Sequence, residues 1–252
     1  MEAEQRLEGG FVNDVVRVGN TVRRSAGYWT PAVHALLDHL EQVGFAASPR
    51  VRGIDEQGRE ILTFLPGETV GWTNWPSHLK TNEGPTKLGR LLRKYHDAVR
   101  NFTPPPDAPW RNVVAEGGDL IRHGDFSPFN VTWIGAEPVG VIDWDFAQPG
   151  KAIDDVAYLA WYLVPLSPDD RVREYGMRTP LDRRARLEAL CDGYGDFTPD
   201  EVIEGAIAVI ETELDHTREL ARRNLHPWRK FAADGSLEAF TREAAWIRDH
   251  LT

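Results

Sequence analysis

The segment 120–147, LIRHGDFSPFNVTWIGAEPVGVIDWDFA, constrains the fold of this chain more than any other part of the sequence. Two short apolar runs within it are separated by the turn-forming residues 135–138, and this pattern predicts a β-hairpin. The hairpin would carry Asn130 at its entry and Asp143 at its exit. Because an antiparallel pair brings these two ends together, we expect the two side chains to lie close in space.

The loop before the hairpin adds a third oxygen-bearing side chain, Asp125. Phosphoryl transfer requires a positioned acceptor hydroxyl and metal ions that neutralise the charge developing on the phosphates. Asp125 is suited to accept the hydroxyl proton, and Asn130 and Asp143 offer the oxygen ligands that magnesium prefers. Each residue alone also has an ordinary structural role, such as capping a turn. Their combined spacing matches the catalytic loop and metal loop of kinases and indicates that chemistry.

The first part of the chain, residues 1–67, has the pattern of a small strand-rich unit with one helix. A hairpin with a Gly-Asn turn is predicted over 15–24. A helix is predicted over 30–43, because a Thr-Pro pair forms a strong helix start. Two further strands are expected near 49–54 and 60–64. The Leu-Pro-Gly-Glu run that follows breaks the pattern and marks a domain boundary.

The second part of the chain, residues 68–252, is predicted to be mainly helical. Apolar positions recur at helical spacing in five segments: 88–99, 153–163, 181–192, 201–223 and 237–251. The fold class expected from both parts is α+β and bilobal, with a small β-sheet lobe and a larger helical lobe. Such an arrangement places a ligand cleft between the two lobes.

Composition limits the partners and the compartment that we expect. The net charge of −10 at pH 7 disfavours nucleic acid and acidic membranes, and it suits a cationic or neutral small substrate. No apolar stretch approaches the roughly 18–20 residues of a membrane span, and the acidic N-terminus lacks a secretory signal pattern. Cys191 is the only cysteine, which excludes an internal disulfide. We therefore expect a cytoplasmic protein with no nucleic-acid or membrane partner.

The motifs HGDFSPFN and VIDWDFAQPG resemble those of the aminoglycoside phosphotransferase family, small-molecule kinases related to choline and homoserine kinases. The segment GGFVNDVVRVGNTVRR adds weaker support. The resemblance covers most of the chain between residues 8 and 165, and no motif beyond it is specific. It implies a protein-kinase-like fold and transfer of the γ-phosphoryl group of ATP or GTP, with Mg2+, to a hydroxyl of a small molecule.

The resemblance also implies roles for residues of the catalytic segment. It makes Asp125 the catalytic base and His123 the residue that braces the loop through its ring nitrogens. Asn130 and Asp143 would be magnesium ligands, with Asp145 a less certain second acid near the metals. A buried histidine without a catalytic role is the alternative for His123.

In the small lobe, the resemblance assigns nucleotide contacts to six residues: Gly10, Asn13, Arg23, Arg24, Phe64 and Leu65. Arg23 aligns best with the strand lysine that normally contacts the phosphates, and Arg24 is the alternate. An arginine can bind phosphate bidentately but does not replace lysine conservatively. The family pattern also expects a helix glutamate that orients this cation, and no residue of the helix is clearly assigned to this role. The polar face of the helix offers only His34, Asp38 and Glu41.

Three functions remain open on the sequence. The first is a kinase, whose acceptor would be an aminoglycoside or another amino alcohol attracted by acidic residues beyond 165, although such charges are usually solvated surface. The second is a nucleotide-binding pseudokinase with a regulatory or partner-binding role, which the arginine and the missing glutamate favour. The third is metal-dependent hydrolysis, for which no HExxH or comparable histidine spacing is present.

Overall fold

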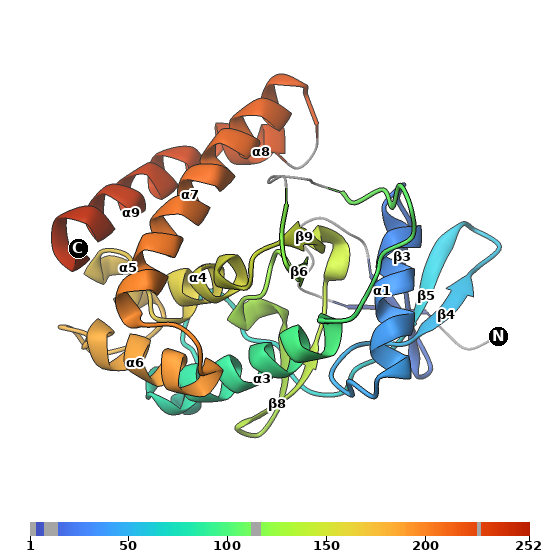
Figure 1. Ribbon diagram of the computed structural model, residues 1–252, viewed down its shortest axis with the longest axis horizontal. Coiled ribbons are helices and arrows are strands. Elements are labelled where there is room, and N and C mark those ends of the chain that lie inside the picture. The colour runs from blue at the N-terminus through green and yellow to red at the C-terminus, as the bar shows by residue number, and fades with distance from the viewer. Residues whose placement is uncertain (1–3, 8–14, 112–116, 226–227) are drawn as a thin grey trace. The chain divides into compact units, whose positions relative to one another are not determined.

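The computed structural model describes residues 4–7, 15–111, 117–225 and 228–252 (Figure 1). The chain divides into two compact units, each made of several segments. The first unit comprises residues 1–71, 94–125 and 129–150, and the second comprises residues 72–93, 126–128 and 151–252. Antiparallel sheets and many helices confirm the α+β fold class. The domain boundary expected near residue 67 stays a prediction.

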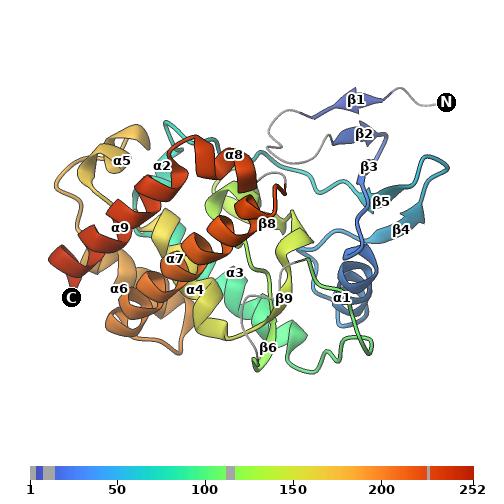
Figure 2. The same cartoon turned by 90° about the horizontal axis from the view of Figure 1, so that it is seen from above.

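A five-stranded antiparallel sheet forms the first part of the first unit (Figure 2). In spatial order its strands are β1 (Gln5–Arg6), β2 (Val16–Val18), β3 (Thr21–Ser25), β5 (Arg59–Thr63) and β4 (Val51–Ile54). The predicted hairpin over 15–24 and the two later strands are confirmed. The pairing of β3 with β5 sets Arg24 directly opposite Glu60, so the two side chains lie on one face of the sheet.

Helix α1 (Thr30–Gln42) is the one helix predicted in this part of the chain, and the structure confirms it. Proline at its first turn lacks the N–H that would have no partner there. Leu36, Leu37 and Leu40 recur at helical spacing and are fully buried. The helix ends before Gly44, whose φ of 77° suits a glycine stop.

Two short strand pairs complete the first unit. Strand β7 (Val131–Ile134) pairs with β8 (Glu137–Val141), which confirms the predicted hairpin. At its base the Ile142 N–H donates to the Asn130 carbonyl at 2.9 Å, so Asn130 and the residue before Asp143 are tied together. Strand β6 (Leu120–Arg122) pairs with β9 (Gln148–Gly150). This second pair was not predicted.

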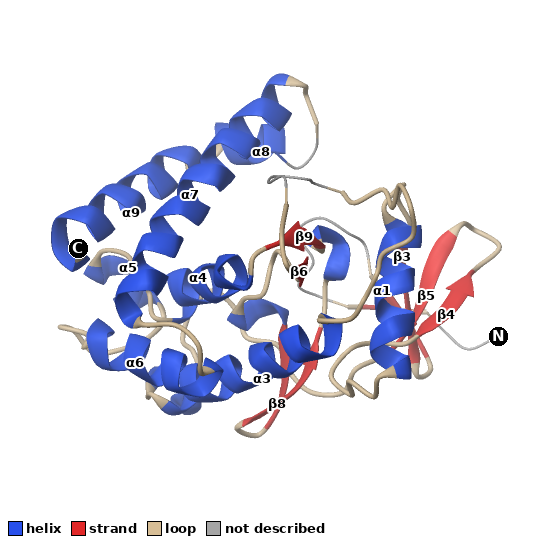
Figure 3. Cartoon of the chain, viewed as in Figure 1, coloured by secondary structure: helices blue, strands red, loops and turns tan. Residues whose placement is uncertain are grey.

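The second unit is mainly helical (Figure 3). Its helices are α2 (Ser77–Lys80), the start of α3 (Glu83–Val99), α4 (Ala152–Leu163), α5 (Asp169–Glu174), α6 (Arg183–Tyr194), α7 (Pro199–Arg222), α8 (Trp228–Ala233) and α9 (Ser236–Leu251). The five predicted helices are confirmed as α3, α4, α6, α7 and α9. The long helix α7 begins with a capping box between Thr198 and Glu201, and it packs against α4 and α9. Among the described residues, no helix has the length and apolar character needed to cross a bilayer.

The buried arginine Arg186 joins three segments of the second unit. Its side chain is 2% exposed. It donates to the backbone carbonyls of Leu79 and Leu163 at 2.9 and 2.7 Å, and to that of Thr81 at 2.9 Å. Burial lowers its pKa to about 10. The guanidinium therefore satisfies carbonyl groups at the ends of α2 and α4 that are otherwise short of donors.

We expect Arg186→Met to lower the free energy of unfolding by about 2 kcal/mol, because three carbonyls lose a donor while the cost of burying a charge disappears. Urea denaturation of the purified protein measures this change. Arg184→Met is the matched control, since Arg184 lies on the same helix with a side chain 55% exposed. Its effect should stay within about 0.5 kcal/mol. Equal effects of the two substitutions would contradict the structural role of Arg186.

Candidate active site

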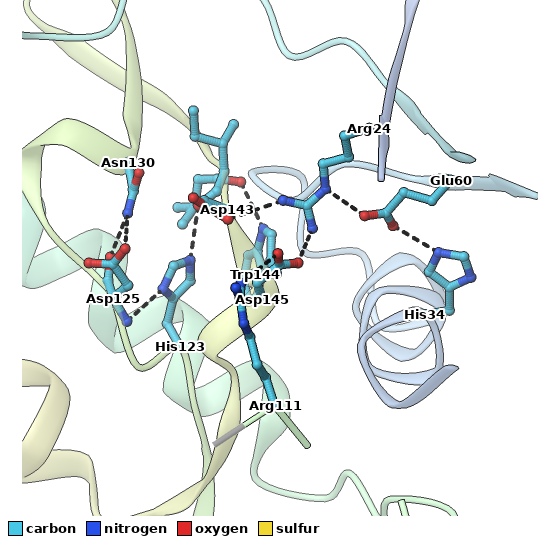
Figure 4. A network of polar contacts seen from close by, with 12 residues as sticks. Arg24, His34, Glu60, Arg111, His123, Asp125, Asn130, Asp143, Trp144 and Asp145 are labelled. Atoms are coloured by element: carbon cyan, nitrogen blue, oxygen red, sulfur yellow. Dashed lines mark hydrogen bonds and ion pairs between the residues drawn. The ribbon is translucent and has the colours of Figure 1, made fainter. Parts of the chain in front are cut away.

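His123 holds the loop that leads from β6 towards the hairpin (Figure 4). The Asp125 N–H donates to His123 Nδ1 at 3.2 Å, so this ring nitrogen is an acceptor. The other ring nitrogen, Nε2, then carries the hydrogen and donates it to the Ile142 carbonyl at 3.1 Å. The ring is fully buried and packs against Trp144, with 4.6 Å between ring centroids. A neutral His123 therefore ties the loop to the backbone just before Asp143.

Asn130 closes the same loop from its other end. Its side-chain Nδ2 donates to both the carbonyl and the carboxylate Oδ2 of Asp125, at 2.9 and 2.8 Å. Asp125 is half-buried and its carboxylate is held in one orientation by this amide. Within the described part of the chain, Asn130 Oδ1 makes no hydrogen bond. This oxygen therefore remains available to a cation.

Gly124 is required by the close approach of another segment. Its φ is 80°, and a Cβ built there would lie 2.1 Å from the Phe146 carbonyl oxygen. Any side chain would therefore displace either the loop or the backbone that follows Asp143.

We expect Gly124→Ala to lower the free energy of unfolding by about 3 kcal/mol, as the sum of left-handed strain and overpacking. Gly135→Ala is the matched control, because Gly135 has a φ of 61° and nothing within 4 Å of an added Cβ. The control should lose only about 1 kcal/mol from backbone strain. Chemical denaturation of both variants measures the difference, and equal losses would show that the contact with Phe146 relaxes without strain.

Asp143 follows β8 in the left-handed conformation, with φ 60° and ψ 65°. Aspartate is among the few residues that adopt this conformation readily. Its side chain is 35% exposed, and its Oδ1 lies 3.0 Å from Arg24 Nη1. Burial raises the pKa of Asp143, Arg24 opposes this effect, and the neighbouring Asp145 adds to it.

Arg24 of β3 lies at the centre of a network of charged side chains (Figure 4). Its Nε donates to Glu60 Oε1 at 2.5 Å, and its Nη2 donates to Asp145 Oδ1. Burial alone would lower the pKa of Arg24, but Asp145, Glu60 and Asp143 together raise it above its ordinary value. The guanidinium therefore stays charged although it is only 7% exposed.

Two further residues support the carboxylates that hold Arg24. His34 Nε2 of α1 lies 3.0 Å from Glu60 Oε2. Arg111 Nη1 donates to Asp145 Oδ2 at 3.1 Å, and its guanidinium lies over the rings of Trp29 and Phe146. Both carboxylate oxygens of Asp145 are therefore engaged by arginines. Glu60 and Arg111 were not singled out in the sequence.

The structure separates the two adjacent arginines that were both candidates for the phosphate contact. Arg24 faces Asp143, whereas Arg23 points to the other side of β3, where it donates to Thr21 Oγ1 at 2.6 Å. Neighbouring residues of a strand point to opposite faces, so only one of them reaches the site. The carboxylate that pairs with this arginine comes from Glu60 on β5 and not from a helix glutamate. Glu60 in turn contacts His34 of α1.

The other residues expected at the nucleotide lie as follows. Phe64 and Leu65 follow β5 and are half-buried, and the Arg17 guanidinium lies 3.8 Å from the centre of the Phe64 ring. Gly10 and Asn13 lie outside the described residues. Asp38 is exposed on α1.

The donor chemistry at the hairpin base fits magnesium. Among the described residues, no group of three or more histidine, cysteine and acidic side chains is arranged to hold a metal ion. Magnesium usually takes only one or two protein ligands and completes its shell with phosphates and waters. Asn130 Oδ1 and the partly exposed carboxylate of Asp143, of which only Oδ1 is paired with an arginine, meet this requirement, whereas arginines engage both oxygens of Asp145.

Solved structures with the same fold belong to small-molecule kinases. A choline/ethanolamine kinase family protein from Mesorhizobium loti has a TM-score of 0.59 and 18% identity, covering 98% of this chain and 92% of that chain. The GDP complex of aminoglycoside 2'-phosphotransferase-IIIa has a TM-score of 0.63 and 14% identity, covering 97% and 93%. A microcompartment-associated aminopropanol kinase has a TM-score of 0.62 and 13% identity, covering 99% and 92%. These matches confirm the protein-kinase-like fold.

Sequence comparison defines the family more narrowly. A profile of the phosphotransferase enzyme family matches residues 107–190, which contain the catalytic loop and the hairpin. The trifolitoxin immunity protein of Rhizobium leguminosarum bv. trifolii is 37% identical over 201 residues, covering 77% of this chain and 75% of that protein. The chain belongs to the phosphotransferase enzyme family. The resemblance stated from the motifs is confirmed.

Proposed function

We propose that the protein transfers the γ-phosphoryl group of ATP or GTP to a hydroxyl group of a small molecule, with Asp125 as the catalytic base. One observation carries the proposal. The loop 123–130 holds the Asp125 carboxylate through Asn130, and both loop ends are hydrogen-bonded to the strand that leads into Asp143. A base and two oxygen ligands are thus fixed relative to one another, which is what positioning catalysis of phosphoryl transfer requires.

In this proposal, separate residues bind the metal, contact the nucleotide and hold the catalytic loop. Asn130 and Asp143 hold magnesium, which neutralises charge on the phosphates when bound. Asp145 holds the two arginines near the metal site, and His123 keeps the loop in place. Arg24 contacts the phosphates. The remaining nucleotide contacts proposed in the small lobe, residues 1–67, are Gly10, Asn13, Phe64 and Leu65, whereas Arg23 faces the other side of β3.

The acceptor is proposed to be a hydroxyl compound such as an aminoglycoside or another amino alcohol. The name of the curated relative, an immunity protein, adds a second class of acceptor, a toxin that phosphorylation would inactivate. A screen for phosphoryl transfer should therefore contain aminoglycosides, small amino alcohols and trifolitoxin. Protection of a toxin-sensitive strain that depends on Asp125 would identify the toxin class.

A nucleotide-binding pseudokinase is the second candidate. The observation that favours it is the ion pair between Arg24 and Asp143, because this pair occupies an oxygen of a proposed metal ligand. Turnover separates the two functions. If the protein is a kinase, the wild type transfers phosphate to at least one acceptor of the screen, and Asp125→Asn loses this transfer.

Thermal unfolding with ATP or GTP, each with and without magnesium, is the first test of the site. A ligand at about 100 times its Kd adds about 2.7 kcal/mol of stability, which raises Tm by about 5 °C or more for a chain of this size. We expect the nucleotide to raise the Tm of the wild type more with magnesium than without it. Asp143→Ala should lose this magnesium-dependent part of the rise. Asp38→Ala, on an exposed face of α1, is the control and should retain it. A folded wild-type protein that shows no shift with either nucleotide would refute the proposed function.

A further inference from the structure

Each nitrogen of the Arg24 guanidinium donates to a carboxylate. Nε contacts Glu60, Nη1 contacts Asp143 and Nη2 contacts Asp145. A phosphate oxygen that approaches Arg24 must therefore either share a donor or replace one of these carboxylates. The contact that gives way decides how nucleotide and metal binding influence each other.

The three contacts of Arg24 differ in how firmly the carboxylate is held. Glu60 and Asp145 have side chains that are each 2% exposed, and each also contacts a second basic side chain. Asp143 is 35% exposed, and among the described residues Arg24 is its only basic partner within ion-pair distance. Water can replace the lost interactions of a partly exposed carboxylate more readily than those of a buried one. The Arg24–Asp143 pair is therefore the one that opens most easily.

The charge balance of the network also opposes phosphate when no metal is present. Three carboxylates, from Glu60, Asp143 and Asp145, surround the two guanidinium groups of Arg24 and Arg111. The formal sum of these five groups is negative, so a phosphate approaching Arg24 meets repulsion from carboxylates that already use its donors. A divalent cation at Asp143 would neutralise one of these negative charges and release Nη1.

We infer that Arg24 and a divalent cation compete for Asp143, so that binding of the cation releases one nitrogen of Arg24 for a phosphate of the nucleotide. The inference rests on the proposed function and adds to it a coupling between the two ligands. An arginine is needed for this coupling, because its planar fork reaches three carboxylates at once. The single ammonium of a lysine does not have this geometry.

The coupling predicts an unusual effect for the substitution Asp143→Asn. Loss of a metal ligand alone would weaken nucleotide binding with magnesium and leave metal-free binding unchanged. If Asp143 also restrains Arg24, the substitution releases Arg24 and strengthens metal-free binding. We expect a gain of about 5-fold or more in metal-free affinity, the lower end of typical coupling between two sites. Asparagine tolerates the left-handed backbone of this position, so the variant should fold.

Isothermal titration calorimetry with ATP and with GTP, each in EDTA and in excess magnesium, tests the inference without measuring turnover. The proteins are the wild type, Asp143→Asn, Arg24→Lys and the double variant. In the Arg24→Lys background, Asp143→Asn should change metal-free affinity by less than about 2-fold, because the restrained fork is already absent. If the lysine variants do not fold, an unchanged or lower metal-free affinity in Asp143→Asn still refutes the inference.

The possible results separate the inference from the function on which it rests. Absence of nucleotide binding by the wild type, with and without magnesium, would refute both. Magnesium-dependent binding by the wild type, with metal-free affinity unchanged or lower in Asp143→Asn, would refute only the coupling. An equal gain in the arginine and lysine backgrounds would also refute it, because removal of a negative charge would then explain the gain. A gain confined to the arginine background supports the competition.

Discussion

Replacing Asp125 with asparagine is expected to lower kcat about 10³-fold, within the usual contribution of a positioned general base. Asparagine has the same size, but its amide does not accept the proton of the acceptor hydroxyl. The loop should remain in place, because His123 and Gly124 hold it through backbone contacts. Steady-state phosphoryl transfer to an acceptor from the screen measures the loss, and the affinity for the magnesium nucleotide should change little.

Asp38→Asn is the control for this experiment, because it makes the same chemical change on an exposed face of α1. It should retain wild-type kcat. Equal turnover by the wild type, Asp38→Asn and Asp125→Asn would show that Asp125 is not the catalytic base. An equal loss in both variants would point to an effect of preparation and not to a base at position 125.

Replacing Arg24 with alanine is expected to lower the free energy of unfolding by about 4 kcal/mol. The substitution leaves the buried carboxylates of Glu60 and Asp145 without their shared cation, and breaking such a buried pair typically costs about 3–5 kcal/mol. Arg24→Lys should lose about half as much, since it restores the charge but not three directed contacts. Urea denaturation at pH 7 measures both variants.

Arg23→Ala is the matched control for Arg24→Ala, because the two residues are neighbours on the same strand and face opposite sides. We expect a loss of about 1 kcal/mol or less for Arg23→Ala. If both alanine variants lost the same stability, the effect would belong to strand β3 and not to the network. If Arg24→Ala lowered the free energy of unfolding by less than about 1 kcal/mol, Arg111 and His34 alone would be sufficient to stabilise the buried carboxylates.

The parts of the fold that depend on neighbouring residues could be predicted from the sequence. The apolar spacing and the start signal of helix α1 lie within fewer than about 20 residues, and so do the apolar runs and the turn of the β7–β8 hairpin. The pairing of β6 with β9 could not be predicted, because each strand has three residues and the partner follows only after the whole hairpin. Helices α2, α5 and α8 span four to six residues, too few for a periodic pattern.

The candidate site follows the same division between local and distant information. Asp125, Asn130 and Asp143 could be predicted because one continuous segment contains them all. The choice between Arg23 and Arg24 could not, because a shift of one residue in strand register exchanges the two faces of β3. Glu60 reaches Arg24 only through the pairing of β3 with β5, and Arg111 arrives from a loop far along the chain. No local pattern marks either residue.

The hydrogen bond between Ile142 and Asn130 has a consequence for how the family can diversify. It fixes the base of the β7–β8 hairpin, whereas the tip is exposed at Ile134 and Gly135 and has open space beside it. Residues added or removed at the tip would therefore alter the outline of the molecule without moving Asn130 or Asp143. Length changes between homologues should accumulate at this tip, and a reporter peptide inserted there should leave the chemistry of the protein intact.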